Sequence, residues 1–266
     1  MIQRWALGLE YAGQGFLGWQ SQPGGRTVQD ALEGALGKVA GVALRVNPLG
    51  RTDTGVHARL QVVHFDAPVQ RPESAWVRGV NAALPQQVAV RWARAVCLQF
   101  HARASATGRH YQYLLQNSPV RPALETGRVG WYHRPLDLAA MRRGAAHLIG
   151  RHDFSAFRAA ECQAPTPVRE LRRLEIAQLG EYFLFHISAD AFLHHMVRNI
   201  IGALVAVGKG KCDPDWLAAI LAGRDRKVAA PTFAADGLYL VGGDYDAHWG
   251  LPETSRPWQL PFSPVE

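Results

Sequence analysis

The sequence predicts an α+β fold with a largely antiparallel sheet, built as two halves that divide near residue 105. Three observations support this prediction. Segments with strand-like alternation are often neighbours along the chain, helical patterns occur irregularly between them, and the second half repeats the order of patterns in the first. A doubly wound parallel sheet would instead show regular alternation of strands and helices. No internal repeat is strong enough to prove a duplication.

The first half begins with an alternating segment at 4–11, which predicts a strand, and continues into a glycine-rich loop at 12–20. A helix is predicted at 27–41, because its apolar residues recur at helical spacing and Thr27 and Asp30 resemble a capping box. The other elements expected in this half are strands at 60–65 and 88–96 and a short helix at 73–84.

The second half is expected to contain a strand at 109–116, a helix at 136–150 that ends at a glycine, and a hairpin of strands at 171–179 and 182–190 around Gly180. The clearest helical pattern of the chain covers 191–208. A helix at 213–223 has an Asp cap and Pro214 at its first helical position, and a last short strand is expected at 237–243.

These elements divide the chain into an N-terminal half at 1–105, a C-terminal half at 106–245 and a proline-rich tail at 246–266. The tail shows no periodicity from Pro252 onward, so we expect an extended arm or a disordered segment there. A cleft is expected between the two halves.

Composition indicates a globular protein of the cytoplasm. No apolar run approaches the roughly 18 residues that a membrane helix needs, and the first residues lack the apolar stretch of a signal peptide. Cys97, Cys162 and Cys212 lie far apart and form no C-x-x-C motif. This cysteine pattern favours a reducing compartment, without a disulfide framework or a thiolate zinc site.

The charge balance is basic. Lys and Arg number 29 against 22 Asp and Glu, which gives a net charge of +7, and 25 of the 29 are arginine. Arginine matches phosphate with two hydrogen bonds and stacks on bases, although codon composition of the genome also produces such a bias. The segment VRWARAVCLQFHARASATGRHYQY (90–113) mixes arginines with aromatic residues and histidines. That mixture favours an RNA or DNA partner.

The segment LGRTDTGVHARLQVVHF (49–65) contains the tripeptide Asp53-Thr54-Gly55. An aspartic protease would need two such loops to share a proton, and Arg51 would keep Asp53 ionised, so this class is not expected. A simple turn with an Asx hydrogen bond is a second interpretation. A polar loop that carries Arg51, Asp53 and His57 into a strand also suits the presentation of a reactive side chain.

Other motifs argue against nucleotide and metal sites. The loop GQGFLGWQ does not lead directly into a helix and lacks a ribose-binding acid, and no P-loop is present, so an ATP or NAD enzyme is not expected. His194 and His195 are adjacent on the predicted helix 191–208, with Arg198 on its polar face, and no H-x-x-x-H spacing occurs. Tyr111 and Tyr113 lie two apart on a strand and are either core residues or a surface for bases.

The assembled motifs closely resemble the bacterial tRNA pseudouridine synthase A family, from about Arg4 to Tyr245. The segments that carry the resemblance are GFLGWQ, GRTDTGVHA, VNAALP, FHARASA, RHYQYLL, FLHHMVRNIIG and GLYLVGGDY, in this order. Two departures are small: family members commonly have Asp where this chain has Ala12, and Ala where it has Thr54.

The resemblance implies two ferredoxin-like halves with a joined, mainly antiparallel sheet and a catalytic cleft between them. It implies a homodimer that binds one tRNA with both subunits, and no metal, nucleotide or other cofactor. The activity it implies is the isomerisation of uridine to pseudouridine at positions 38, 39 and 40 of the anticodon stem-loop.

The resemblance also implies roles for single residues. Asp53 matches the nucleophile, Tyr111 the tyrosine that stacks on the target base, and Arg51 the arginine that assists base flipping. Arg198 resembles the basic partner of the aspartate, and Leu238 the apolar residue that closes the pocket. Residues expected to contact tRNA are Arg51, Arg71, Phe100, His101, Ala102, Arg103, Ala104, Glu161, Cys162, Gln163, Ala164 and Pro165.

The chemistry of such a reaction suits these residue types. A carboxylate kept ionised by a guanidinium can add to the substrate and leave again, at C6 of uracil or at C1′ of ribose. An arginine and an aromatic ring offset the few kcal/mol needed to unstack a base. Two other classes stay open on the sequence: an RNA-binding module without activity, which would not need Asp53, and a hydrolase that uses Asp53.

Overall fold

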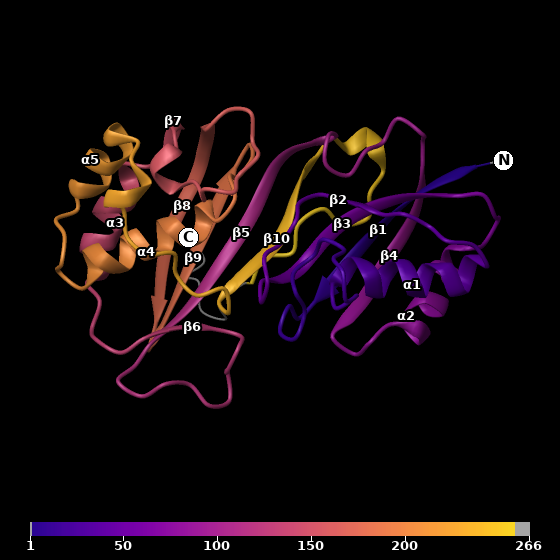
Figure 1. Cartoon of the computed structure of the whole chain (residues 1–266), viewed down its shortest axis with the longest axis horizontal. Helices are drawn as coiled ribbons and strands as arrows, with labels where there is room; N and C mark the ends of the chain where they lie inside the picture. Colours follow the sequence, from indigo (N-terminus) through magenta and orange to yellow (C-terminus); the bar gives the residue numbers. More distant parts are fainter. Residues whose placement is uncertain (1, 259–266) are drawn as a thin grey trace. The chain divides into compact units, whose positions relative to one another are not determined.

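The computed structural model describes residues 2–258 and groups them into two compact units. Of the described residues, the first unit takes 2–108 and 239–257, and the second takes 109–238 and 258. Figure 1 shows the chain coloured along its sequence. The division into domains at 1–105, 106–245 and 246–266 stays a prediction.

The first unit is a sheet with helices packed against it. Its strand order is β4 (Val88–Val96), β1 (Gln3–Tyr11), β3 (His57–Ala67) and β10 (Leu238–Tyr245), with the short β2 (Asn47–Pro48) beside β3. β1 is antiparallel to both neighbours, and β10 runs parallel to β3. The core includes an aromatic cluster, in which Trp76 packs its ring 6.0 Å from Trp5 on β1 and 5.1 Å from Phe65 on β3.

Helix α1 (Val28–Ala40) confirms the predicted helix at 27–41. The Thr27 hydroxyl accepts a hydrogen bond from the amide of Asp30, and Gly41 ends the helix in the left-handed conformation that glycine adopts without strain. The helix predicted at 73–84 is less regular. Ala75–Gly79 wind as a π-helix before α2 (Val80–Ala83), and Leu84 turns extended because a proline follows it.

The second unit pairs β5 (Ala106–Asn117), β9 (Tyr182–Ala189), β8 (Val168–Leu179) and β7 (Gly150–Asp153) in that order, all antiparallel. The short β6 (Gly130–Tyr132) runs parallel to β5. The predicted hairpin is confirmed, with Gly180 at a positive φ of 56° in its turn. Helices α3 (Leu138–Ala146), α4 (Met196–Gly208) and α5 (Trp216–Gly223) lie together beside these strands (Figure 1).

The start predicted for α4 is wrong by five residues, because the helix begins at Met196 and not at 191. The Asp190 carboxylate accepts hydrogen bonds from the amides of Glu170 and Ala191, which turns the chain at the end of β9. His195 then adopts a left-handed φ of 61°, so the helix starts only after it. His194 and His195 therefore precede the helix and do not lie on its polar face.

The other two helices of this unit are also shorter than predicted. α3 ends at Ala146, and Gly150, expected as its terminal glycine, begins β7 at a φ of 108°. Pro214 lies before α5, because the Asp213 carboxylate accepts from the amide of Asp215 and a turn precedes the first helical residue. The α+β class and the predominance of antiparallel pairs within each unit are as the sequence predicted.

The chain after β10 returns along that strand. The amide of Arg256 donates to the carbonyl of Val241, and the amide of Gly243 donates to that of Thr254. The rest of the predicted tail, 259–266, lies outside the described residues. Within residues 2–258, every helix is too short or too polar to cross a membrane.

Candidate active site

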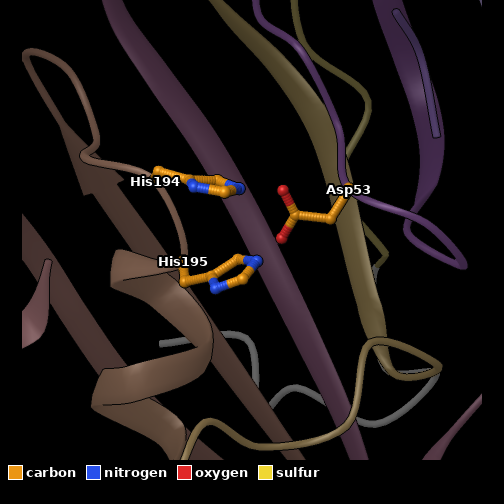
Figure 2. Close-up of side chains that lie close together, drawn as sticks. All are labelled: Asp53, His194 and His195. Carbon is orange, nitrogen blue, oxygen red and sulfur yellow. The ribbon is translucent and has the colours of Figure 1, made fainter. Parts of the chain in front are cut away.

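Asp53 lies in the loop that leads into β3 and is half-buried (Figure 2). The amide of Val56 donates to the carbonyl of Asp53 at 3.1 Å, and Gly55 takes a φ of 81°, so the D-T-G tripeptide does form a turn. Left-handed backbone at this position explains the glycine. The turn interpretation and the reactive-loop interpretation are thus compatible, because the turn presents the carboxylate.

The residues around Asp53 are held by buried polar groups. The Tyr11 and Thr52 hydroxyls lie 2.8 Å apart, and the side-chain amide of Gln61 bonds both the N–H and the C=O of Gly50. Burial raises the pKa of Tyr11 to about 12, so its hydroxyl stays protonated at neutral pH. The sequence analysis did not predict a role for Tyr11, Thr52 or Gln61. For Tyr11 and Gln61 the available signal was a polar side chain within an apolar strand.

The loop GQGFLGWQ packs its backbone directly on the Asp53 loop. A Cβ at Gly18 would lie 2.8 Å from the carbonyl oxygen of Thr52 and 3.1 Å from the carbonyl carbon of Asp53. A Cβ at Gly13 would collide with the backbone of Val56. His57 is buried, and its Nδ1 accepts from the amide of Gly13 at 3.0 Å. The glycines of this motif thus permit close approach to the Asp53 loop.

We expect Gly18→Ala to lower activity far more than Gly15→Ala. Both glycines have a positive φ, of 83° and 87°, so both substitutions carry a similar backbone strain of about 1 kcal/mol. Only the new methyl group at 18 meets the Asp53 loop, since nothing lies within 4 Å of a Cβ at 15. Displacing a reactive group by about 1 Å costs on the order of a hundredfold in rate. Turnover rates beside thermal melts of both variants check this, and equal activities would contradict it.

The other predicted residues of the first unit differ in exposure. Arg51, Arg71, Arg103 and Ala104 are exposed, and His101 is half-buried. The side chains of Phe100 and Ala102 are buried. A contact of the 100–104 segment with RNA would therefore involve its exposed side chains and its backbone, with Phe100 as an anchor of the loop. The Arg71 guanidinium donates to the carbonyls of Val39 and Gln70.

His64, on β3, lies beneath this segment and is almost fully buried. Its Nδ1 accepts from the amide of Ala102 at 3.1 Å. Burial, with the nearby His101 and Arg4, lowers the pKa of His64 to about 4, while Asp66 and the Asn47 backbone oppose the decrease. Sequence reasoning did not single out His64, because an apolar strand pattern around it predicts only burial.

The pKa of His64 predicts a loss of stability in acid. The unfolded chain takes up this proton near pH 6.5 and the folded chain only near pH 4, so the free energy of unfolding decreases as the pH falls between these values. We expect this residue to lower the free energy of unfolding by about 2 kcal/mol when the pH falls from 7 to 5. Denaturant titrations of wild type and His64→Asn should show a flatter pH dependence in the variant, and parallel curves would contradict the prediction.

In the second unit, the two tyrosines of RHYQYLL differ. Tyr113 is buried, and its hydroxyl donates to the carbonyl of Ala234 at 3.0 Å, so it is a core residue. Tyr111, on β5, is half-buried, and its ring meets that of Phe192 edge-on at 5.1 Å. Phe192 lies in the turn before α4. Of the two tyrosines, Tyr111 is therefore the one placed to meet a ligand.

Arg198 and Leu238 are connected through the segment that precedes β10. The Arg198 guanidinium donates from Nε to the carbonyl of Phe233 at 2.9 Å, and the Phe233 amide donates back to the carbonyl of Arg198 at 3.2 Å. This exchange ties the first turn of α4 to the segment that ends at Leu238, which is buried. Both residues thus have constrained positions within the second unit.

The turn before α4 carries two imidazoles side by side. The rings of His194 and His195 lie 4.0 Å apart and point the same way (Figure 2). Adjacent residues on a helix would diverge by about 100°, but the left-handed His195 brings the rings together. The backbone of His194 is held by the neighbouring loop, since its carbonyl accepts from the amide of Ala159.

The predicted contact segment 161–165 is the same loop. Glu161, Gln163 and Pro165 are exposed, while Cys162 and Ala164 are half-buried. The Arg158 guanidinium donates to the carbonyls of Cys162 and Ala164. Partial burial by itself would raise the pKa of the Cys162 thiol, but hydrogen bonds from the His194 and Ala164 amides and the charge of Arg158 lower it overall.

A supported carboxylate, exposed arginines and a half-buried tyrosine on an α+β scaffold suit an enzyme that modifies RNA. Comparison with known proteins agrees. The family described as tRNA pseudouridine synthase matches residues 9–103 and 145–246. The chain belongs to this family, and it is an isomerase that converts uridine in tRNA to pseudouridine.

Two relatives match over nearly their full length. A protein named tRNA pseudouridine synthase A from Dechloromonas aromatica is 62% identical over 250 residues, covering 94% of this chain and 95% of the relative. The protein of the same name from Thiobacillus denitrificans is 60% identical over 262 residues, covering 98% and 100%. A solved structure described as "Crystal Structure of a Cbf5-Nop10-Gar1 Complex" aligns with a TM-score of 0.36 and 12% identity, over 89% of this chain and 48% of that chain.

Proposed function

We propose that this enzyme isomerises uridines 38, 39 and 40 of the tRNA anticodon stem-loop, with Asp53 as the nucleophile. The observation that carries the proposal is the support of the Asp53 loop. Buried hydrogen bonds hold Gly50 and Thr52 before the aspartate, and glycines allow a second loop to pack on its backbone. Such an arrangement orders a reactive carboxylate when the protein folds, so little further entropy is lost when the substrate reacts.

In the proposed reaction, the bond between C1′ and N1 of uridine breaks and a bond between C1′ and C5 forms. The Asp53 carboxylate adds to the substrate, at C6 of uracil or at C1′ of ribose, and is released again. The C5 hydrogen leaves as a proton and N1 gains one, so atoms and charge balance without a cofactor. The freed uracil has to rotate without escaping, which requires an enclosed pocket.

The remaining proposed roles are those that the family resemblance implies, and the side-chain chemistry is compatible with them. Arg51, which is exposed, occupies the space that the flipped base leaves, and Tyr111 stacks on that base. Arg198 is the basic partner of the aspartate, and the buried Leu238 closes the apolar side of the pocket. Contacts with the rest of the tRNA come from Arg71 and from the segments 100–104 and 161–165.

The finer architecture is part of the proposal. We expect two ferredoxin-like halves with a joined sheet, a catalytic cleft between them, a homodimer that binds one tRNA, and a cytoplasmic location. The strand and helix content of each unit supports the first of these expectations, since each packs helices on a mainly antiparallel sheet.

The test follows C5 hydrogen release from tRNA labelled with tritium at C5 of uridine. We expect release from a tRNA that carries uridine at 38, 39 or 40, and none from a matched tRNA with cytidine at all three positions. The mass of the RNA should stay unchanged, which separates isomerisation from hydrolysis. Release that persists in the cytidine tRNA would place the target elsewhere, and RNA cleavage would support the hydrolase interpretation.

A further inference from the structure

The loop 97–105, between β4 and β5, is anchored from inside the first unit. The Arg4 guanidinium donates from Nη1 to the carbonyls of Leu98 at 2.5 Å and Phe100 at 3.0 Å. Arg4 is itself fixed by two hydrogen bonds to the Asp66 carboxylate, at 2.6 and 2.7 Å. The buried ring of Phe100 packs 5.7 Å from Tyr245 and 5.4 Å from Trp249. The first part of the loop thus has little freedom.

Two imidazoles hold the second part. His64 accepts from the amide of Ala102 at 3.1 Å, and His101 accepts through its Nδ1 from the amides of Arg103 at 3.2 Å and Ala104 at 3.3 Å. The two rings lie 4.4 Å apart. The Tyr245 hydroxyl donates to the carbonyl of Ala102 at 2.5 Å. The backbone amides of Ala102, Arg103 and Ala104 therefore all donate to histidine nitrogens.

This arrangement requires both Nδ1 atoms to be free of protons, since an N–H cannot accept. Successive amides in such a loop commonly bind an anion, but here the histidines occupy them. The side chain of Arg103 extends from this loop and is exposed, and its guanidinium is an anion-binding group. The histidines determine the backbone from which that side chain extends.

We infer that His64 and His101 are positioning residues that fix the loop 97–105 so that the Arg103 guanidinium meets a phosphate of the tRNA. The inference rests on the proposed function, in which this segment contacts tRNA. Arginine forms two parallel hydrogen bonds with phosphate, so the strength of the contact depends on the orientation of the guanidinium. A backbone ordered before binding lowers the entropy that the contact has to overcome.

The test compares His101→Ala and His64→Leu, which remove the acceptors, with Arg103→Ala, which removes the guanidinium. We expect each to raise the KM for tRNA by about tenfold, with the loss in KM rather than kcat. The slope of log affinity against log salt should become shallower by about 0.7 to 0.9, the value of one phosphate contact. The double variant His101→Ala/Arg103→Ala should be no weaker than Arg103→Ala.

Two controls separate positioning from general destabilisation. His64→Asn keeps an acceptor at the δ position and should restore most of the affinity that His64→Leu loses, whatever its melting temperature. His101 is only half-buried, so His101→Ala provides a folded variant if His64→Leu does not fold. A change in folding alone would lower the active fraction without altering the salt slope.

The inference is overturned if folded His101→Ala and His64→Leu bind tRNA as the wild type does, or if the losses in the double variant add. It is also overturned if Arg103→Ala leaves KM and the salt slope unchanged. None of these results would contradict the proposal that the enzyme isomerises uridines 38, 39 and 40. Failure of the wild type to act at those positions would overturn the proposed function instead, and the two failures are therefore distinguishable.

Discussion

Asp53→Asn is expected to abolish pseudouridine formation while the affinity for tRNA stays within about tenfold of wild type. The amide is nearly the same size as the carboxylate, and the loop is held by Gly50, Thr52 and the turn to Val56, so the fold should survive. An amide is a very poor nucleophile here, so the covalent step should fail. Binding depends mainly on arginine and phosphate, which this change leaves intact.

The matched control is Thr54→Ala, the next residue of the same loop. Thr54 is exposed, and we expect this variant to keep its activity within a few-fold of wild type. Tritium release, tRNA binding at one salt concentration and a thermal melt should be measured for both variants. Full activity in folded Asp53→Asn would remove the nucleophile assignment, and an equal loss in Thr54→Ala would indicate a damaged loop.

Tyr111→Ala is expected to lower kcat/KM by about a hundredfold, and Tyr111→Phe by much less. Stacking of a base on an aromatic ring is worth about 1 to 3 kcal/mol, and phenylalanine keeps the ring. The edge contact with Phe192 orients the Tyr111 ring on β5, and either aromatic residue preserves it. Steady-state kinetics on the same tRNA measures both variants.

The neighbouring tyrosine serves as the control. Tyr113→Phe removes a buried hydrogen bond to the carbonyl of Ala234 and should reduce the free energy of unfolding by about 1 kcal/mol, with kinetics unchanged. A hundredfold loss in Tyr111→Phe would instead assign a proton transfer to the hydroxyl. Wild-type kinetics in Tyr111→Ala would make Tyr111 a structural residue.

Elements with strong local signals were predicted well from the sequence. β4 was predicted at 88–96 and spans Val88–Val96, and α1 begins directly after its predicted cap Thr27 and ends at Ala40, within the predicted range 27–41. Caps and turns involve residues three or four apart, so the responsible atoms are adjacent in the sequence. The segment 191–208 was harder, because a continuous apolar pattern predicts a helix but does not locate its first residue. That residue depends on Asp190 and on Glu170, which is 20 residues away.

The sequence by itself determined the α+β class, most of the strands and the candidate residues, because periodicity and motif order are properties of neighbours along the chain. Only the tertiary structure decided how those residues are held. Gly18 packs against Thr52, His64 lies beneath Ala102, and Tyr11 bonds Thr52 across 41 positions. The physical reason is that a buried polar group is stable only with a partner, and that partner is chosen by strand pairing and not by sequence distance.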